Sequence, residues 1–450
     1  MPDPKLARAL RRRRREAARV VGADGVLILA AAGNVTRNRD VHYPFRQDSD
    51  FGYLTGFPEP DAVAVLVPKR KHGEFILFCR PRDKERELWD GARLGVEGAV
   101  ADYGADEAHP LDAIDSTLPE LLADRTRIFY PLGTSDALDR RVMGWLRQVR
   151  AKARAGVSAP TELITSDRIL HEQRLIKSKP ERDTMRRAAR ISAAAHRQLM
   201  RGCRPGMNEQ QLEALFVATC AAQGARHQAY QPIVGGGANA CVLHYVDNAA
   251  PLRDGDLVLV DAGCELDDYA SDITRTFPVN GRFSPAQRRL YALVLAAQKA
   301  AIAAVKPGNR WNAPHQAALR VLTRGLLELG LIAGDPKHLS RLIKDEAYKP
   351  FYMHRTGHWL GMDVHDVGSY RHDGKWRRLE PGMVLTVEPG LYVAPDADAP
   401  ADYRGIGIRI EDDVLVTTDG CEVLSRDAPK EIDDIEHLMA AAQPPLESRT

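Results

Sequence analysis

Residues 257–263 read Leu-Val-Leu-Val-Asp-Ala-Gly and residues 383–390 read Met-Val-Leu-Thr-Val-Glu-Pro-Gly, so each is an apolar run that ends in an acidic residue. Short apolar runs bounded by Gly or Pro are typical of buried strands. A second strand follows each run, over residues 269–276 and 407–414, and carries a further acid. The two acidic strand pairs predict two related halves, although no repeat of residue identity links them.

Four helices are predicted to accompany these strands. Ser178 and Glu181 form a capping box, and Pro180 suits the first turn, so a long helix runs from there to about Cys203. The other three begin after Asn208, at Ser284 and after Asn312. Residues 173–450 therefore form one domain of mixed α and β structure.

The first 172 residues alternate strands with helices. Residues 25–29, 62–67 and 75–79 read as buried strands with polar, turn-rich pieces between them. This alternation favours an α/β domain with a mixed sheet. The sequence thus predicts two domains of an α/β (α+β) protein, 1–172 and 173–450.

The overall composition is that of an ordinary globular protein. The 450 residues include 63 Lys and Arg against 61 Asp and Glu, a formal charge of +2, which argues against a nucleic-acid-binding protein. The apolar stretch 26–32 is too short to cross a bilayer. Six scattered cysteines without a CxxC pair favour reduced thiols and a cytoplasmic location. An export signal after the arginines 11–15 is disfavoured, because Arg19 and Asp24 precede the apolar run and no clean cleavage site follows.

Four acids are candidates for a metal site. Asp261 and Asp272 can face each other in a hairpin with its turn near residues 265–268. Glu388 and Glu411 lie at the end of, or within, apolar strand sequence, where a charge must be paired or bind a metal. A salt bridge of Glu411 with Arg409 is the alternative, although both side chains lie on the same side of the strand and can serve one site.

Three histidines accompany these acids. The stretch 353–366 contains His354, His358 and His365, which is three of the 14 histidines in the chain. Four ionised carboxylates carry a charge of −4, which two divalent ions cancel, and a carboxylate pair at 4 Å repels by about 4 kcal/mol at an effective dielectric of 20. Oxygen ligands with one imidazole suit Mn, Co or Zn. This composition indicates a metal-assisted amide hydrolase.

At these residues the chain resembles the creatinase/aminopeptidase family with the pita-bread fold, and most closely its aminopeptidase P branch. The resemblance covers nearly the whole chain. It includes the order Asp, Asp, His, Glu, Glu, carried by Asp261, Asp272, His358, Glu388 and Glu411, each within a matching string such as Gly357-His358-Trp359-Leu360-Gly361 and Val387-Glu388-Pro389-Gly390.

The resemblance implies a dinuclear site, usually of manganese, held by those five residues. It implies that a hydroxide bridging the metals attacks the Xaa-Pro amide and releases the N-terminal residue of peptides with proline in second position. Glu388 is implied as the proton shuttle, and Arg409 as an arginine near the substrate path. His365, His244 and His354 match histidines that line the site.

The N-terminal part is similar to the family's non-catalytic domain at residues 43–57 and 80–93. In relatives this domain shapes the substrate entrance and contributes to a homodimer or homotetramer. Asp50 and Trp89 are the candidates for this rim, with packing and turn capping as the alternative, and Tyr230 is a further candidate for substrate contact. The expected partner is a peptide with a penultimate proline, with no nucleic acid and no membrane.

Four other functions remain to be weighed. An Xaa-Pro dipeptidase of the same fold has the same five ligands, and only substrate length separates it. Methionine aminopeptidase does not need the 170 additional residues, and metal-free creatinase does not need five metal-binding residue types. A non-catalytic pita-bread module that binds peptides or histones lacks the ligands that this chain retains.

Overall fold

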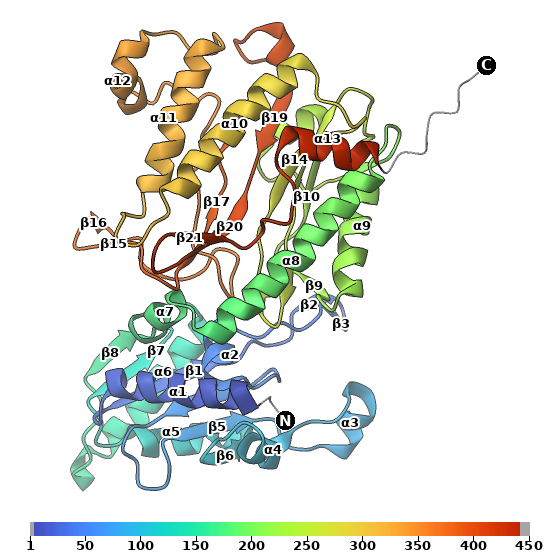
Figure 1. Cartoon of the computed structure of the whole chain (residues 1–450). Coiled ribbons are helices and arrows are strands. Elements are labelled where there is room, and N and C mark those ends of the chain that lie inside the picture. Colours follow the sequence, from blue (N-terminus) through green and yellow to red (C-terminus); the bar gives the residue numbers. More distant parts are fainter. Residues whose placement is uncertain (1–3, 442–450) are drawn as a thin grey trace. The chain divides into compact units, whose positions relative to one another are not determined.

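The computed structural model describes residues 4–441. Figure 1 shows the chain, which divides into two compact units, Met1–Arg174 and Leu175–Thr450. The fold is mixed α/β in both units, as the sequence predicts. No helix within residues 4–441 is both long enough and apolar enough to cross a bilayer.

The N-terminal unit is built on a mixed six-stranded sheet with the order β6-β5-β4-β1-β7-β8. β4 pairs antiparallel with β1 and β5, while the β1–β7, β5–β6 and β7–β8 pairs are parallel. The strands are β1 (Gly25–Ala30), β4 (Val63–Leu66), β5 (Phe75–Cys79), β6 (Glu107–Pro110), β7 (Arg127–Tyr130) and β8 (Glu162–Thr165). The three strands predicted from apolar runs are confirmed.

Helices cover both faces of this sheet. Val26 and Ile28 of β1 belong to one apolar cluster and Leu27 and Leu29 to another, so successive residues face opposite cores. This explains why the strands are apolar throughout. The first core contains residues of α5 (Ile114–Leu122) and α6 (Asp136–Ala151), and the second contains residues of α1 (Pro4–Val21), α2 (Ser49–Thr55), α4 (Gly95–Ala101) and α7 (Asp167–Leu175). Helix α3 (Lys84–Asp90) and the hairpin of β2 (Thr36–Asn38) and β3 (Val41–His42) bury none of their residues.

The C-terminal unit repeats one arrangement, two helices followed by a three-stranded antiparallel sheet. Its four main helices begin where the sequence predicts, and the capping boxes at Ser178, Asn208 and Ser284 are present. Figure 1 shows α10 and α11 side by side. The first half contains α8 (Lys179–Gly202), α9 (Glu209–Ala222), β10 (Ile233–Gly236), β11 (Leu257–Asp261) and β14 (Thr274–Pro278); the second contains α10 (Pro285–Ala303), α11 (Ala313–Glu328), β17 (Val384–Val387), β20 (Asp412–Val416) and β21 (Cys421–Val423).

The prediction of continuous strands over residues 269–276 and 407–414 is wrong, because both strands break at their acid. The backbone N–H of Asp272 donates to the carboxylate of Asp413, and that of Glu411 donates to the carbonyl of Thr274. These two N–H groups do not donate within the regular strand pairing. Separate short sheets therefore form on the other side of each break. They consist of β12 (Cys264–Leu266) with β13 (Tyr269–Ala270) and β9 (His227–Gln228), and of β18 (Gly390–Val393) with β19 (Ile406–Arg409).

The remaining elements of the C-terminal unit are short and lie outside these sheets. They are α12 (Leu339–Lys344), α13 (Ile432–Ala440) and the hairpin formed by β15 (Arg371–His372) and β16 (Lys375–Trp376).

A buried ionic network joins the two halves beneath their acids. Arg275, in β14, is fully buried and donates to Asp412 Oδ1 at 2.7 Å. The other carboxylate oxygen of Asp412 accepts from Lys430 at 2.5 Å and from Gln298 at 2.7 Å. Because each partner is satisfied, the network fixes β14 against β20.

A second buried ion pair lies near the start of the C-terminal unit. Lys177 Nζ donates to Asp366 Oδ2 at 2.8 Å, and both side chains are 1% exposed. The Asp366 carboxylate also packs closely against Gly361, where an added Cβ would lie 2.0 Å from Asp366 Oδ2. The backbone N–H of Asp366 donates to Trp359, so the pair holds the loop of residues 361–366 closed.

Replacing Lys177 by Met should destabilise the C-terminal unit by about 3 to 5 kcal/mol, because it removes the buried ammonium that pairs with the Asp366 carboxylate. Chemical unfolding measures the loss. The double variant Lys177→Met, Asp366→Leu removes both charges and should recover most of it. Equal stability of the wild type and the single variant would contradict this account.

His196, in α8, makes stability depend on pH. Its Nε2–H donates to the Ala262 carbonyl at 3.0 Å, and burial lowers the pKa of the imidazole to about 4. The folded protein therefore keeps His196 neutral, while the unfolded chain protonates it near its ordinary pKa of about 6.5. Its contribution to stability is complete above pH 6.5 and is lost as the pH falls toward 4.

The variant His196→Gln retains an N–H donor but does not titrate. When the pH falls from 7.5 to 4.5, we expect its free energy of unfolding to decrease by about 2 to 3 kcal/mol less than that of the wild type. Urea unfolding at the two pH values measures the difference. Parallel losses in the two proteins would show that His196 is not the titrating group.

Candidate functional site

One cavity of about 470 Å³ in the C-terminal unit collects the predicted acids from both halves. The first half supplies Asp261, the last residue of β11, and Asp272, in the break before β14. The second half supplies Glu388, which follows β17, and Glu411, in the break between β19 and β20. Each acid thus lies where a ladder ends, which leaves its carboxylate free of the sheet.

Tyr230 joins the two aspartates. Its hydroxyl lies 2.5 Å from Asp261 Oδ1 and 2.5 Å from Asp272 Oδ1. Asp261 pairs with Thr274 in the ladder, so the two acids are offset by two residues rather than directly opposite. Since a hydroxyl donates only one proton, the second short contact requires a further proton or a cation near these oxygens.

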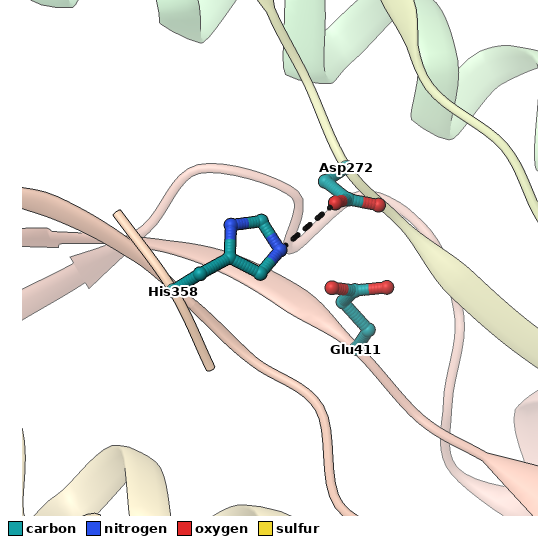
Figure 2. Close-up of side chains that lie close together, drawn as sticks. All are labelled: Asp272, His358 and Glu411. Atoms are coloured by element: carbon teal, nitrogen blue, oxygen red, sulfur yellow. Dashed lines mark ion pairs between the residues drawn. The ribbon is translucent and has the colours of Figure 1, made fainter. Parts of the chain in front are cut away.

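His358 presents a lone pair to the acids. Its Nδ1–H donates to the Trp359 carbonyl at 3.0 Å, so Nε2 is unprotonated in the neutral ring. Nε2 lies 3.4 Å from Asp272 Oδ2 and 3.8 Å from Glu388 Oε1. Figure 2 shows His358, Asp272 and Glu411 converging on one point, and their ligand atoms lie within 4.8 Å of one another.

The environment of the cavity favours protonation of its carboxyl groups or the binding of cations to them. Burial, and then the charge of Glu411, raises the pKa of Glu388 to about 8. Burial and neighbouring aspartate charges hold the pKa values of Asp272 and Glu411 well above their usual range. Glu411 has one strong donor, the Thr274 hydroxyl at 2.6 Å.

The donor set fits a divalent cation. Carboxylate oxygens with one imidazole nitrogen are ligands of Mn, Co and Zn. One ligand atom from each of Asp272, His358 and Glu411 lies within 4.8 Å of the other two, which places all three around one candidate ion position. The backbone bond of His358 Nδ1 is the second contact that metal-binding histidines typically make.

A hydrogen-bonded chain orients the remaining predicted residues. Arg409 donates to Asp261 Oδ2 at 2.5 Å and to the Tyr392 hydroxyl at 2.9 Å. The Nδ1–H of His354 donates to the Arg355 carbonyl, so its Nε2 accepts from Tyr392 at 2.9 Å. Burial lowers the pKa of His354 to about 4, which keeps the ring neutral. The salt bridge considered for Arg409 thus forms with Asp261.

Two further histidines line the cavity and are exposed, His244 and His365. The His365 ring packs edge-on against His358 with centroids 4.3 Å apart. His365 lies on the loop that the Lys177–Asp366 ion pair holds closed. Burial lowers the pKa of His365 below its ordinary value.

Asp50 and Trp89 belong to the N-terminal unit and are not among the residues that line this cavity. Asp50 binds His171 at 3.2 Å and Arg174 at 2.8 Å. Burial opposes ionisation of Asp50, but these two partners hold its pKa below the usual range. Trp89, in α3, is 86% exposed. Their assignment to a substrate rim stays a prediction.

Sequence reasoning missed three residues that support the site. Tyr392 lies in an apolar strand without any signal of a polar role. Thr356 lies in a loop, and its backbone carbonyl accepts from the backbone N–H of Glu388. Lys177 stands in a stretch that otherwise reads as a domain boundary. Their partners are distant in sequence, so only the fold reveals them.

Comparisons with known proteins agree with this geometry. Residues 183–418 match the model of metallopeptidase family M24, and residues 10–130 match that of the aminopeptidase P N-terminal domain. The chain is 45% identical to an Escherichia coli K12 Xaa-Pro aminopeptidase over 96% of its own length and 97% of that protein. It is 38% identical to human Xaa-Pro aminopeptidase 3, over 94% and 82% of the two chains.

Solved structures show the same fold. Pseudomonas aeruginosa aminopeptidase PepP is 55% identical, with a TM-score of 0.95 over 97% of this chain and 98% of that one. Zinc-substituted E. coli aminopeptidase P in complex with product is 44% identical, with a TM-score of 0.94 over 97% and 99%. The chain therefore belongs to metallopeptidase family M24, and within it to the aminopeptidase P group of metalloaminopeptidases.

Proposed function

We propose that this protein is an Xaa-Pro aminopeptidase that uses two divalent cations, with manganese preferred over cobalt or zinc. It removes the N-terminal residue from peptides with proline in the second position. The observation that carries the proposal is the convergence of three buried carboxylates, the half-buried Glu388 and His358 in one cavity. Its similarity to Xaa-Pro aminopeptidases over almost the whole chain supports the choice of substrate.

Asp261, Asp272, His358, Glu388 and Glu411 would hold the cations. Bound there, the cations would supply Lewis acidity and lower the pKa of a water molecule toward neutrality. With all four acids ionised, two divalent ions cancel their charge of −4. Arg409 then keeps Asp261 oriented through its bond to Oδ2, and Tyr230 fixes the spacing between the aspartates.

Glu388 moves the proton in this mechanism. Its carboxylate oxygens lie 3.8 Å from His358 Nε2 and 3.7 Å from His354 Nδ1, within the cavity. It accepts a proton from the attacking water and donates it to the prolyl nitrogen, which leaves as an amine. An amide nitrogen leaves as a neutral amine only after it gains a proton, so the departing prolyl nitrogen depends on this donor.

His365 and His244 act on the scissile carbonyl. Both are exposed in the cavity, where the N–H of a neutral imidazole donates to the oxygen as it gains negative charge. Donors of this kind stabilise the transition state more than the substrate, so they raise kcat. The Lys177–Asp366 ion pair keeps the His365 loop in place during the reaction.

We further propose a cytoplasmic homodimer or homotetramer, in which residues 1–172 form a non-catalytic rim and residues 173–450 the catalytic domain. Asp50 and Trp89 belong to this rim in the proposal, and Tyr230 contacts substrate from the cavity floor. Sedimentation analysis of the purified protein measures its assembly, and a monomer at micromolar concentration would contradict this part.

Substrate length tests the function. With manganese, the enzyme should release alanine from Ala-Pro-Gly at least tenfold faster than from Ala-Pro, and should leave Ala-Ala-Gly intact. Product analysis by chromatography measures each rate. Cleavage of Ala-Pro alone would identify a dipeptidase instead.

Asp272→Asn tests the shared-ligand role. The amide cannot carry the charge that balances the cations, so we expect metal content to fall below one ion per chain and activity to fall at least a thousandfold. Elemental analysis and peptide hydrolysis measure the two effects. Asp183→Asn, at an exposed ion pair on α8, is the matched control and should retain both. Two tightly bound ions in Asp272→Asn would refute the assignment.

A further inference from the structure

The mouth of the catalytic cavity carries one exposed residue with a permanent charge, Arg355. The exposed residues that line this cavity are Gln231, His244, Val246, Arg355 and His365. Within residues 4–441, no carboxylate forms an ion pair with Arg355, and its guanidinium lies over an aromatic ring. An exposed guanidinium at the edge of an enzyme cavity is a ready site for a carboxylate.

The other guanidinium in this cavity is not available to a ligand. Arg409 is buried and is bonded to Asp261, Tyr392 and Thr274. Arg355 directly follows His354 in sequence, so its Cα is about 3.8 Å from a residue of the cavity wall. It therefore lies close to the reacting groups. Its backbone carbonyl accepts from His354, while its guanidinium takes no part in their hydrogen-bonded chain.

An aromatic ring supports the Arg355 side chain. Its Cζ lies 5.7 Å from the ring centroid of Trp376, in β16. Arg371 contacts the same ring, with its Cζ at 4.0 Å from the centroid, yet it does not line the cavity. Two exposed arginines thus contact the ring of Trp376, and of these two Arg355 lines the cavity.

The charges of the cavity orient a peptide. Its buried and half-buried lining includes four acids, which would form a compact charged centre with bound cations, while its exposed lining includes Arg355. A peptide with a free amine and a free carboxylate avoids placing its amine beside Arg355 and gains by placing its carboxylate there. In Xaa-Pro-Yaa the carboxylate lies two residues beyond the scissile bond, about 7 Å at 3.3–3.6 Å per residue, within reach of an arginine side chain.

We propose that Arg355 binds a carboxylate on the leaving side of the substrate, which makes it a specificity residue for short or acidic peptides. This inference rests on the proposed function. The carboxylate comes either from the C-terminus of a tripeptide or from an acidic side chain at the third position. In both cases the contact is a charge-assisted pair of N–H donors to carboxylate oxygens.

Four peptides separate the two sources on the manganese-loaded enzyme: Ala-Pro-Gly, Ala-Pro-Gly-amide, Ala-Pro-Glu-amide and Ala-Pro-Gln-amide. We expect KM to be about tenfold lower for a peptide with the relevant carboxylate than for its uncharged partner. Ala-Pro-Gly against its amide tests the C-terminus, and the Glu amide against the Gln amide tests the side chain. A lower KM in either comparison supports the contact.

Three variants test whether Arg355 causes the lower KM for peptides with a carboxylate. Arg355→Gln should abolish the difference in KM while kcat for the uncharged peptides stays unchanged, and Arg355→Lys should restore part of it. Arg371→Gln removes the other arginine on Trp376 and should keep the full preference.

Equal KM within both pairs in the wild type, or a preference that survives in Arg355→Gln, would overturn the carboxylate contact alone. A loss of the preference in Arg371→Gln as well would also overturn it, since the effect would then be one of general charge. Failure of the wild type to cleave all four peptides would overturn the proposed function, and this inference with it.

Discussion

The crowding of four buried or half-buried carboxylates around one cavity is the constraint on which this structure depends. Two ionised carboxylates 4 Å apart repel by about 4 kcal/mol at an effective dielectric of 20. In the cavity, oxygen atoms of Asp272 and Glu411 lie within 4.8 Å of each other. Arg409 compensates one of them through Asp261, and hydroxyls such as that of Thr274 compensate others. The remaining charge requires protons or divalent cations, so folding and metal binding are coupled at this site.

Backbone hydrogen bonds position two of these acids at the cavity. Neither Asp272 nor Glu411 lies inside a regular ladder, because each occupies a break where its own N–H bonds to the opposite half. Beneath them, the Arg275–Asp412 pair joins β14 to β20, so the two halves cannot separate without exposing a charge. The acids are therefore held by the packing of both halves.

The sequence predicts the parts of this fold that local chemistry determines. Capping boxes set the starts of α8, α9 and α10, and apolar runs between turns set the positions of β1, β5 and β11. The acids and His358 stand out because charges in apolar strand sequence need partners. The strand breaks could not be predicted, since they depend on bonds such as that from Asp272 to Asp413, 141 residues apart. Tyr392 was missed for the same reason, because its partners His354 and Arg409 meet it only in the folded chain.

The Lys177–Asp366 ion pair also bears on how such a chain can recombine during evolution. The match to the M24 family model begins at residue 183, yet the ammonium that neutralises Asp366 lies six residues earlier, in the segment that leads from the N-terminal unit. An exchange of N-terminal domains that replaces residue 177 by an uncharged side chain removes the ammonium that pairs with Asp366. A buried charge thus extends the catalytic unit upstream of the residues that the family model matches.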